Sequence, residues 1–188
     1  MKERLDNGGY ITQALLDIVP AKEEMDRAST NQLWLAFRAL VNMREPWRAD
    51  ADLLAAQDEL LQGMIEEAGI TTVDEATPSP LDPRLRLWKG DITTLAADAI
   101  VNAANSGMTG CWAPLHYCID NAIHTFAGMQ LRYECARRMI EQGHEEPTGQ
   151  AKVTPAYNLP AKHVIHTVGP IANGALNDNC LLYTSDAA

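Results

Sequence analysis

The sequence predicts an α/β domain preceded by an α-helical N-terminal extension. Up to about residue 80, apolar residues recur with the spacing of amphipathic helices. Beyond about residue 84, short apolar and alternating segments typical of strands flank one long helical segment. A succession of strand, helix and strand indicates helices packed on a sheet, and the hydrophobic fraction of 46% is ordinary for a globular chain.

Three helical segments are expected in the extension, residues 1–80. The first covers residues 11–19 and is ended by Pro20. The second covers residues 29–43, begins at Ser29 or Asn31 as the cap, and has apolar residues at i, i+3, i+4, i+7 and i+8. These residues are Leu33, Trp34, Phe37, Leu40 and Val41. The third covers residues 51–67, and Gly69 is its expected C-terminal stop.

The α/β part begins after residues 71–83, which are rich in Pro, Thr and acidic residues and predict a linker or surface loop. A short strand is expected around residues 85–88 and a buried strand at residues 98–102. One helix is expected over residues 119–142, with Gly143 just beyond it. Two further strands are expected at residues 151–155 and 163–168.

The chain divides into an extension at 1–80, an α/β domain at 84–172 and a tail at 173–188. A sheet that begins near residue 84 normally needs further crossover units to cover it, and none follow Pro170. We therefore expect a fragment with a truncated or non-native tail.

Charge and hydropathy exclude several classes of function. The formal net charge is -10 at pH 7, which disfavours binding to nucleic-acid phosphates. No run of about 18 apolar residues occurs, and no signal pattern opens the chain, so we expect no membrane partner and a cytoplasmic location. A nucleotide-like ligand is still compatible with this charge, because backbone N–H groups and helix N-termini can hold phosphate.

The densest group of reactive side chains is Cys111, His116 and Cys118, which fall in a predicted loop just before the long helix. Two thiolates and one imidazole suit zinc better than magnesium or calcium. Three protein ligands would leave a fourth tetrahedral position open, as in catalytic zinc sites. The alternative is that two cysteines are simply buried beside a loop histidine.

Two further polar residues follow this loop on the predicted helix. Asp120 stands near the helix N-terminus, where it either caps the helix or orients a water molecule near an anomeric carbon. His124, one turn later, is expected to pack between elements or to support the site from behind.

Two loop motifs follow predicted strands, where ligands bind in open α/β sheets. In Gly90-Asp91-Ile92-Thr93, the Asp91 carboxylate can accept a hydrogen bond from an exocyclic amine, although Asp and Thr also cap turns. In the segment from Asn102 to Gly107, small residues allow close approach of a ligand, and Asn102 and Asn105 can bond sugar hydroxyls.

Taken together and in this order, the motifs resemble a macrodomain. They are GDIT (90–93), DAIVNAAN (98–105), GCWAPLHYCIDNAIHTFAGMQLR (110–132) and TGQAKVTPAYNLPAKHVIHTVGP (148–170). The Cys/His loop resembles the zinc-containing, MacroD-like subgroup of protein-ADP-ribose hydrolases. FRALVNMREP (37–46) and QDELL (57–61) resemble the N-terminal extension of that subgroup. The implied fold is a three-layer α/β/α macrodomain with a mixed central sheet, incomplete at its C-terminal end.

The resemblance also implies a site. Asp91 and Ile92 would meet adenine, and Asn102 and Asn105 would line the distal ribose. Cys111, His116 and Cys118 would hold Zn2+ beside that ribose, with Asp120 and Asn105 as the catalytic residues. The substrate would be a protein carrying one ADP-ribose, and the products would include ADP-ribose.

Three functions are compatible with these residues. The first is a zinc-dependent hydrolase of the ADP-ribosyl–protein bond, and the second is a module that binds ADP-ribose without cutting it. In the third, zinc only pins the loop and Asp120 only caps the helix. The glycine-rich diphosphate loop of such macrodomains has no counterpart after Gly169-Pro170, so we expect the hydrolase in the full-length parent and an inactive fragment here.

Overall fold

The computed structural model describes residues 29–170, so the segment expected at residues 11–19 and the tail at 173–188 lie outside the described residues. Its first helix, α4 (Thr30–Met43), begins where the sequence predicts, because Ser29 and Gln32 form a capping box. Helix α5 (Ala51–Ala68) is capped by Asp50, whose side chain accepts from the N–H of Leu53. It ends at Gly69, whose φ of 89° suits glycine, as predicted.

The face of α4 that turns inward differs from the predicted apolar stripe. Its buried residues are Ala36, Ala39 and Asn42, whereas Leu33 and Leu40 are 37% and 44% exposed. Small side chains allow α4 to lie close to the domain. Trp34 still packs inward, with its ring 5.5 Å from that of Phe126.

The region between α5 and the central sheet contains short paired segments. They are β1 (Thr71–Thr72), η1 (Val73–Glu75), β2 (Thr77–Pro78), β3 (Arg86–Leu87), η2 (Ile92–Thr94) and β4 (Leu95–Ala96). Strand β1 pairs parallel with β4, and β2 pairs antiparallel with β3. The expected linker at 71–83 is therefore partly structured. The expected strand near residue 86 has only two residues and does not join the central sheet.

The central sheet consists of β5 (Ala99–Ala104), β6 (Ala151–Pro155) and β7 (His163–Val168) in the order β5-β7-β6. Strands β5 and β7 are parallel, and β6 and β7 are antiparallel, so the sheet is mixed. All three strands were predicted, and the mixed α/β fold class is confirmed. The register places Asn102 opposite His166.

The prediction of one long helix over residues 119–142 is wrong. The segment forms two helices, α6 (Ile119–Ala127) and α7 (Met129–Gln142), that meet at Gly128. Gly128 has a φ of 97°, and a Cβ at this position would lie only 2.5 Å from Nε2 of Gln57 on α5. The positive φ favours glycine here, because a residue with a side chain would be strained in this backbone conformation.

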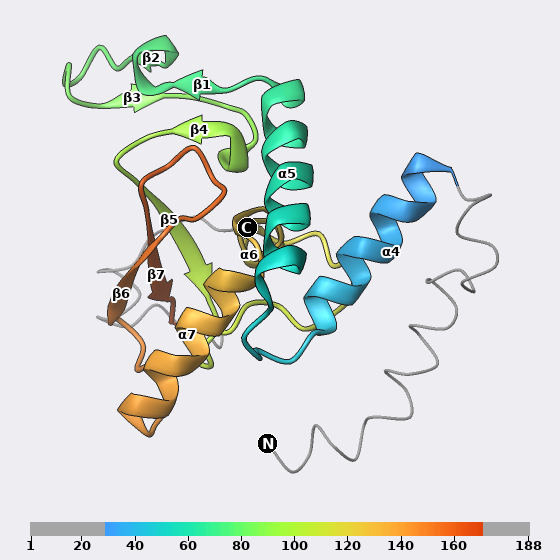
Figure 1. Ribbon diagram of the computed structural model, residues 1–188. Helices are drawn as coiled ribbons and strands as arrows, with labels where there is room; N and C mark the ends of the chain where they lie inside the picture. The colour runs from blue at the N-terminus through green and yellow to red at the C-terminus, as the bar shows by residue number, and fades with distance from the viewer. Residues whose placement is uncertain (1–28, 171–188) are drawn as a thin grey trace.

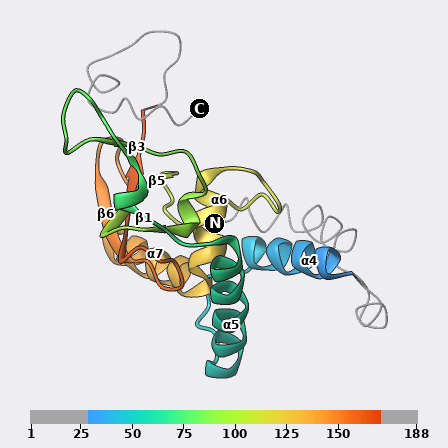
Figure 2. The same ribbon diagram turned by 90° about the horizontal axis from the view of Figure 1, so that it is seen from above.

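The core lies between the sheet and the helices that cover one of its faces (Figures 1 and 2). It is formed by apolar residues of α5, α6, α7 and the strands, which include Ile65, Ile100, Ile123, Leu131 and Val164. On the opposite face, Val101 and Val153 are 50% and 49% exposed. Of the three layers expected, residues 29–170 thus supply the sheet and one helical layer. Within these residues, no helix has the length and apolar character needed to cross a membrane.

Candidate active site and metal-ligand loop

The loop that carries the predicted metal ligands connects β5 to α6 and is held in an unusual backbone conformation. Met108 and Leu115 adopt positive φ values of 58° and 60°, which are uncommon for residues with side chains. Gly110 has a φ of 79°, and a Cβ there would lie 2.7 Å from Cγ of His124. The loop therefore rests directly on the His124 ring, and only glycine fits at the point of contact.

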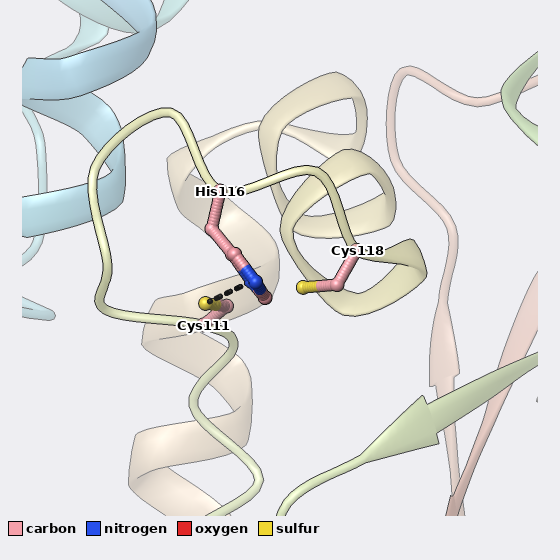
Figure 3. A group of neighbouring side chains, drawn as sticks. All are labelled: Cys111, His116 and Cys118. Carbon is pink, nitrogen blue, oxygen red and sulfur yellow. Dashed lines mark hydrogen bonds between the residues drawn. The ribbon is translucent and has the colours of Figure 1, made fainter. Parts of the chain in front are cut away.

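The loop brings Cys111, His116 and Cys118 together, as expected. Sγ of Cys111 lies 3.5 Å from Nδ1 of His116, and the ligand atoms of all three residues lie within 4.8 Å of one another. Figure 3 shows their side chains pointing toward a common centre from the loop and from the start of α6. The donor set of two sulfurs and one imidazole nitrogen is one that zinc prefers.

Cys118 also serves as the N-cap of α6, since its Sγ accepts a 3.4 Å hydrogen bond from the N–H of Asn121. The capping role considered for Asp120 therefore falls to Cys118. Burial raises the pKa of the Cys118 thiol, and the neighbouring Cys111 raises it further, while the bond from Asn121 lowers it. The two sulfurs are close enough to repel each other as thiolates, which a bound cation would relieve.

Asp120 points into the protein and is only 5% exposed. Its Oδ1 accepts a 2.8 Å hydrogen bond from Asn102, and its Oδ2 accepts one of 3.3 Å from Asn105. Burial raises the pKa of this carboxyl group, while the two amides and the nearby charge of Arg132 oppose the rise. Asn105 also donates to the carbonyl of Gly110, so it joins the carboxylate to the loop. The two predicted catalytic residues are thus in direct contact.

Asn102 lies behind Asp120 and is fully buried. Its amide group faces Nδ1 of His166 at 3.1 Å as well as Asp120. Nδ1 of His166 must therefore accept, which leaves Nε2 to donate to the hydroxyl of Thr154 at 3.0 Å. Burial lowers the pKa of His166 to about 4, so the ring is neutral near pH 7. In this arrangement the Asn102 amide nitrogen holds Asp120 and His166, and the contact of Asn102 with the distal ribose stays a prediction.

His124 lies beneath the loop, and its side chain is 2% exposed. Its Nε2 is 3.6 Å from Oδ1 of Asp120, and neither ring nitrogen has a hydrogen-bond partner among residues 29–170. Burial holds the pKa of His124 well below its ordinary value. The ring lies close to Cys135 and His166 in the core, which agrees with the packing role expected for it.

The residues predicted to meet adenine lie on η2, at some distance along the chain from the loop. The Asp91 side chain is the N-cap of η2, and its Oδ1 accepts from the N–H and hydroxyl of Thr93. Asp91 is exposed, and Ile92 is partly buried against the core. Asp91 therefore fulfils the turn-capping role that the sequence left open, whether or not it also contacts a ligand.

Three residues of the site had no predicted role. Asn42 and Arg38 on α4 reach the metal-ligand loop and Asn121, as detailed below. Arg132 on α7 is 5% exposed and donates to the carbonyls of Asn42, Arg44 and Cys111. The sequence feature that could have indicated these residues is a polar side chain next to apolar ones in a helical segment. Asn42 follows Leu40 and Val41, and Arg132 follows Leu131.

Comparison with known proteins agrees with this geometry. Residues 101–184 match the model of the macro domain family. The mixed sheet with its covering helices, together with this match, gives the chain the macrodomain fold.

The chain is similar to proteins named protein-ADP-ribose hydrolase. It is 56% identical over 158 residues to the one from Treponema medium, across 80% of this chain and 60% of that protein. It is 46% identical over 143 residues to the one from Staphylococcus aureus strain MSSA476, across 76% of this chain and 53% of that protein. The chain thus spans between about half and 60% of the length of these curated relatives.

Among solved structures, the chain resembles the Trypanosoma brucei macrodomain in complex with ADP-ribose. The TM-score is 0.47 and the sequence identity 29%, over 71% of this chain and 59% of that one.

Proposed function

We propose that the protein is a zinc-containing hydrolase that releases ADP-ribose from mono-ADP-ribosylated proteins. The observation that carries this proposal is the convergence of Cys111, His116 and Cys118 beside the buried Asp120 and its hydrogen-bond partner Asn105. The names of the relatives from Treponema medium and Staphylococcus aureus support the same activity.

Zinc fits the three residues because their donor atoms lie within 4.8 Å of one another and combine soft sulfur with imidazole nitrogen. Cys111, His116 and Cys118 would hold the ion and leave one position open. When bound, zinc would supply Lewis acidity and a fixed point for a hydroxyl group of the ribose.

The chain's own residues would orient the reacting groups. The Asp120 carboxylate, held by two amides, would accept a proton from the water that attacks the anomeric carbon. The bond from that carbon to the protein side chain would break at the same time, and the side chain would leave with the electron pair. Asn105 is exposed and bonded to Asp120, so its side chain would meet the distal ribose while keeping the carboxylate aligned. Asn102 would position Asp120 from behind.

The adenine end of ADP-ribose would lie at η2. Oδ2 of Asp91 accepts no hydrogen bond from residues 29–170 and could accept one from adenine N6, with Ile92 against the ring. The partner would be a modified protein and not nucleic acid, whose phosphates the net charge of -10 disfavours. A membrane partner is not proposed, because the sequence has no run of about 18 apolar residues. We place the reaction in the cytoplasm.

The test measures zinc content and release of ADP-ribose from a mono-ADP-ribosylated protein by the full-length parent, because this chain spans only 53% to 60% of the length of its relatives. We expect about one zinc per chain, loss of zinc in Cys118→Ala, and a fall in rate of about 100-fold or more in Asp120→Asn. Glu59→Gln, at an exposed position of α5, is the matched control and should keep full activity.

Two results would contradict the proposal. If zinc-free Cys118→Ala releases ADP-ribose at the normal rate, zinc has no part in the reaction. If the zinc-bound full-length parent binds ADP-ribose but never releases it from a modified protein, the protein is a reader of the modification.

A further inference from the structure

The metal-ligand loop contains a backbone conformation that needs external support. Leu115, the residue before His116, has a φ of 60°. A left-handed conformation at a residue with a large side chain persists only where surrounding contacts fix it. Its N–H donates a 3.2 Å hydrogen bond to Oδ1 of Asn42 on α4, which lies 73 positions earlier in the chain.

Asn42 is 1% exposed, and every polar atom of its side chain contacts the loop or the helix that follows it. Oδ1 accepts from the N–H of Leu115 and also from Nδ2 of Asn121, at 2.6 Å. Nδ2 donates to the hydroxyl of Thr125 at 2.9 Å. Asn121 follows Cys118 by three residues, so one side chain of α4 joins both flanks of the segment from His116 to Cys118.

Arg38, one turn earlier on α4, makes a second bridge. Its guanidinium donates to the carbonyl of His116 at 2.8 Å and to Oδ1 of Asn121 at 2.9 Å. The same group lies 5.0 Å from the centre of the Tyr117 ring, and Tyr117 is 87% exposed. The guanidinium therefore fixes the backbone of a predicted ligand directly and holds the residue after it.

We propose that α4 is a working part of the metal site, with Asn42 and Arg38 as positioning residues that hold the Cys111–Cys118 loop ready for the ion. This inference rests on the zinc site of the proposed function. A ligand loop without regular structure loses conformational freedom when it binds a metal, and contacts that fix it beforehand reduce that loss. Helix α4 fixes the loop from outside the α/β domain.

The experiment measures the affinity of the full chain for Zn2+ by competition with a chromogenic chelator, alongside the unfolding free energy of the metal-free chain. Arg38→Met retains the aliphatic stem at a half-buried position and removes both bridging hydrogen bonds. Asn42→Ala removes the buried acceptor, and Asn42→Asp restores it, because a carboxylate also accepts from Leu115 and Asn121. Asn31→Ala, at an exposed position of the same helix, is the matched control.

We expect Arg38→Met and Asn42→Ala to weaken zinc binding by about 10- to 100-fold, as loss of supporting contacts does at other metal sites. Asn42→Asp should recover much of the affinity, and Asn31→Ala should bind as the unchanged chain does. If Asn42→Ala does not fold, the zinc affinity of Arg38→Met tests the inference by itself.

Wild-type affinity in folded Arg38→Met would overturn the inference and leave the proposed function intact. A chain that binds no zinc at all would overturn both the inference and the zinc-dependent part of the function. Conversely, if these variants lose affinity while the bound ion proves irrelevant to ADP-ribose release, the inference stands and the proposed mechanism fails.

Discussion

The amide of Asn102 donates to Oδ1 of Asp120 at 2.8 Å and lies 3.1 Å from Nδ1 of His166, so one buried NH2 group serves both neighbours. An amide nitrogen carries two hydrogens, which matches these two acceptors. Asn102 and His166 are direct partners in the β5–β7 ladder. The orientation of the candidate catalytic carboxylate is therefore fixed by the central sheet.

Replacing Asn102 with leucine tests this relationship, since leucine has similar volume and no donors. In the full-length parent we expect ADP-ribose release to fall by about 100-fold, because small displacements of a reacting group have large effects on rate. The unfolding free energy should fall by about 1–3 kcal/mol, because buried Asp120 and His166 lose a partner. Val101→Thr, on the half-exposed face of the same strand, is the control. Full activity in Asn102→Leu would show that Asp120 needs no such support.

Cys118 is both a predicted zinc ligand and the N-cap of α6, and its replacement by serine or by alanine distinguishes the two roles. Both substitutions should abolish zinc binding, because neither supplies a thiolate. Serine can still accept a hydrogen bond from the N–H of Asn121, whereas alanine cannot. In the metal-free state we therefore expect Cys118→Ala to be less stable than Cys118→Ser by about 1 kcal/mol, measured by urea unfolding. Equal stability of the two variants would mean that the cap contributes nothing.

His166 predicts a pH dependence of stability. Burial lowers its pKa to about 4, below the ordinary 6.5, so the unfolded chain takes up a proton first as the pH falls. The stabilising effect of the neutral ring is complete above pH 6.5 and is lost down to about pH 4. The slope from this group is about 1.4 kcal/mol per pH unit.

The measurement is the unfolding free energy between pH 7 and 4. His166→Gln should flatten the curve, although buried His124, whose pKa is also lowered, retains a slope of the same sign. Ile165→Val, at a neighbouring position of β7 without a titratable group, should leave the shape of the curve unchanged. A wild-type curve that stays level down to pH 4 would contradict the prediction.

Two glycines in helical regions should respond in opposite directions to alanine. Gly128 has a φ of 97°, and a Cβ there would displace the side-chain ends of Gln57 and Gln130, so Gly128→Ala should destabilise the fold by about 1–3 kcal/mol. Gly63, inside α5, has nothing within 4 Å of the position of a Cβ. Gly63→Ala should therefore stabilise by about 0.5–1 kcal/mol. Thermal unfolding of both variants checks the pair, and a neutral Gly128→Ala would mean that α5 can move away.

Local signals in the sequence were sufficient for most of the regular structure. The cap at Ser29, the stop at Gly69 and the strands at 151–155 and 163–168 depend on neighbouring residues, and the structure confirms them. The break at Gly128 was missed because the contact made there is not local: the N–H of Met129 donates to Oε1 of Gln57 on α5. A periodic pattern cannot report a helix that approaches from elsewhere in the chain.

In the candidate site, too, features that depend on neighbouring residues were predicted, and features that depend on tertiary contacts were not. Cys111, His116 and Cys118 lie within one short segment, and their convergence was predicted. The burial of Asn102 and the contacts of Asn42 and Arg38 arise from tertiary packing between α4, β5 and α6. No local pattern of residue types reveals which polar side chain will face which loop.

The pairing of β5 with β7 has a consequence for how the molecule folds. Asn102 and His166 are separated by 64 positions, and the loop and both helices α6 and α7 lie between them. Bringing the two strands together over so long a stretch of chain costs conformational entropy before any hydrogen bond between β5 and β7 can form, which slows folding. The helices can form early, but the Asp120 carboxylate acquires its final orientation only when β5 and β7 have paired. We therefore expect the ligand-binding capacity of a refolding chain to return later than its helical signal.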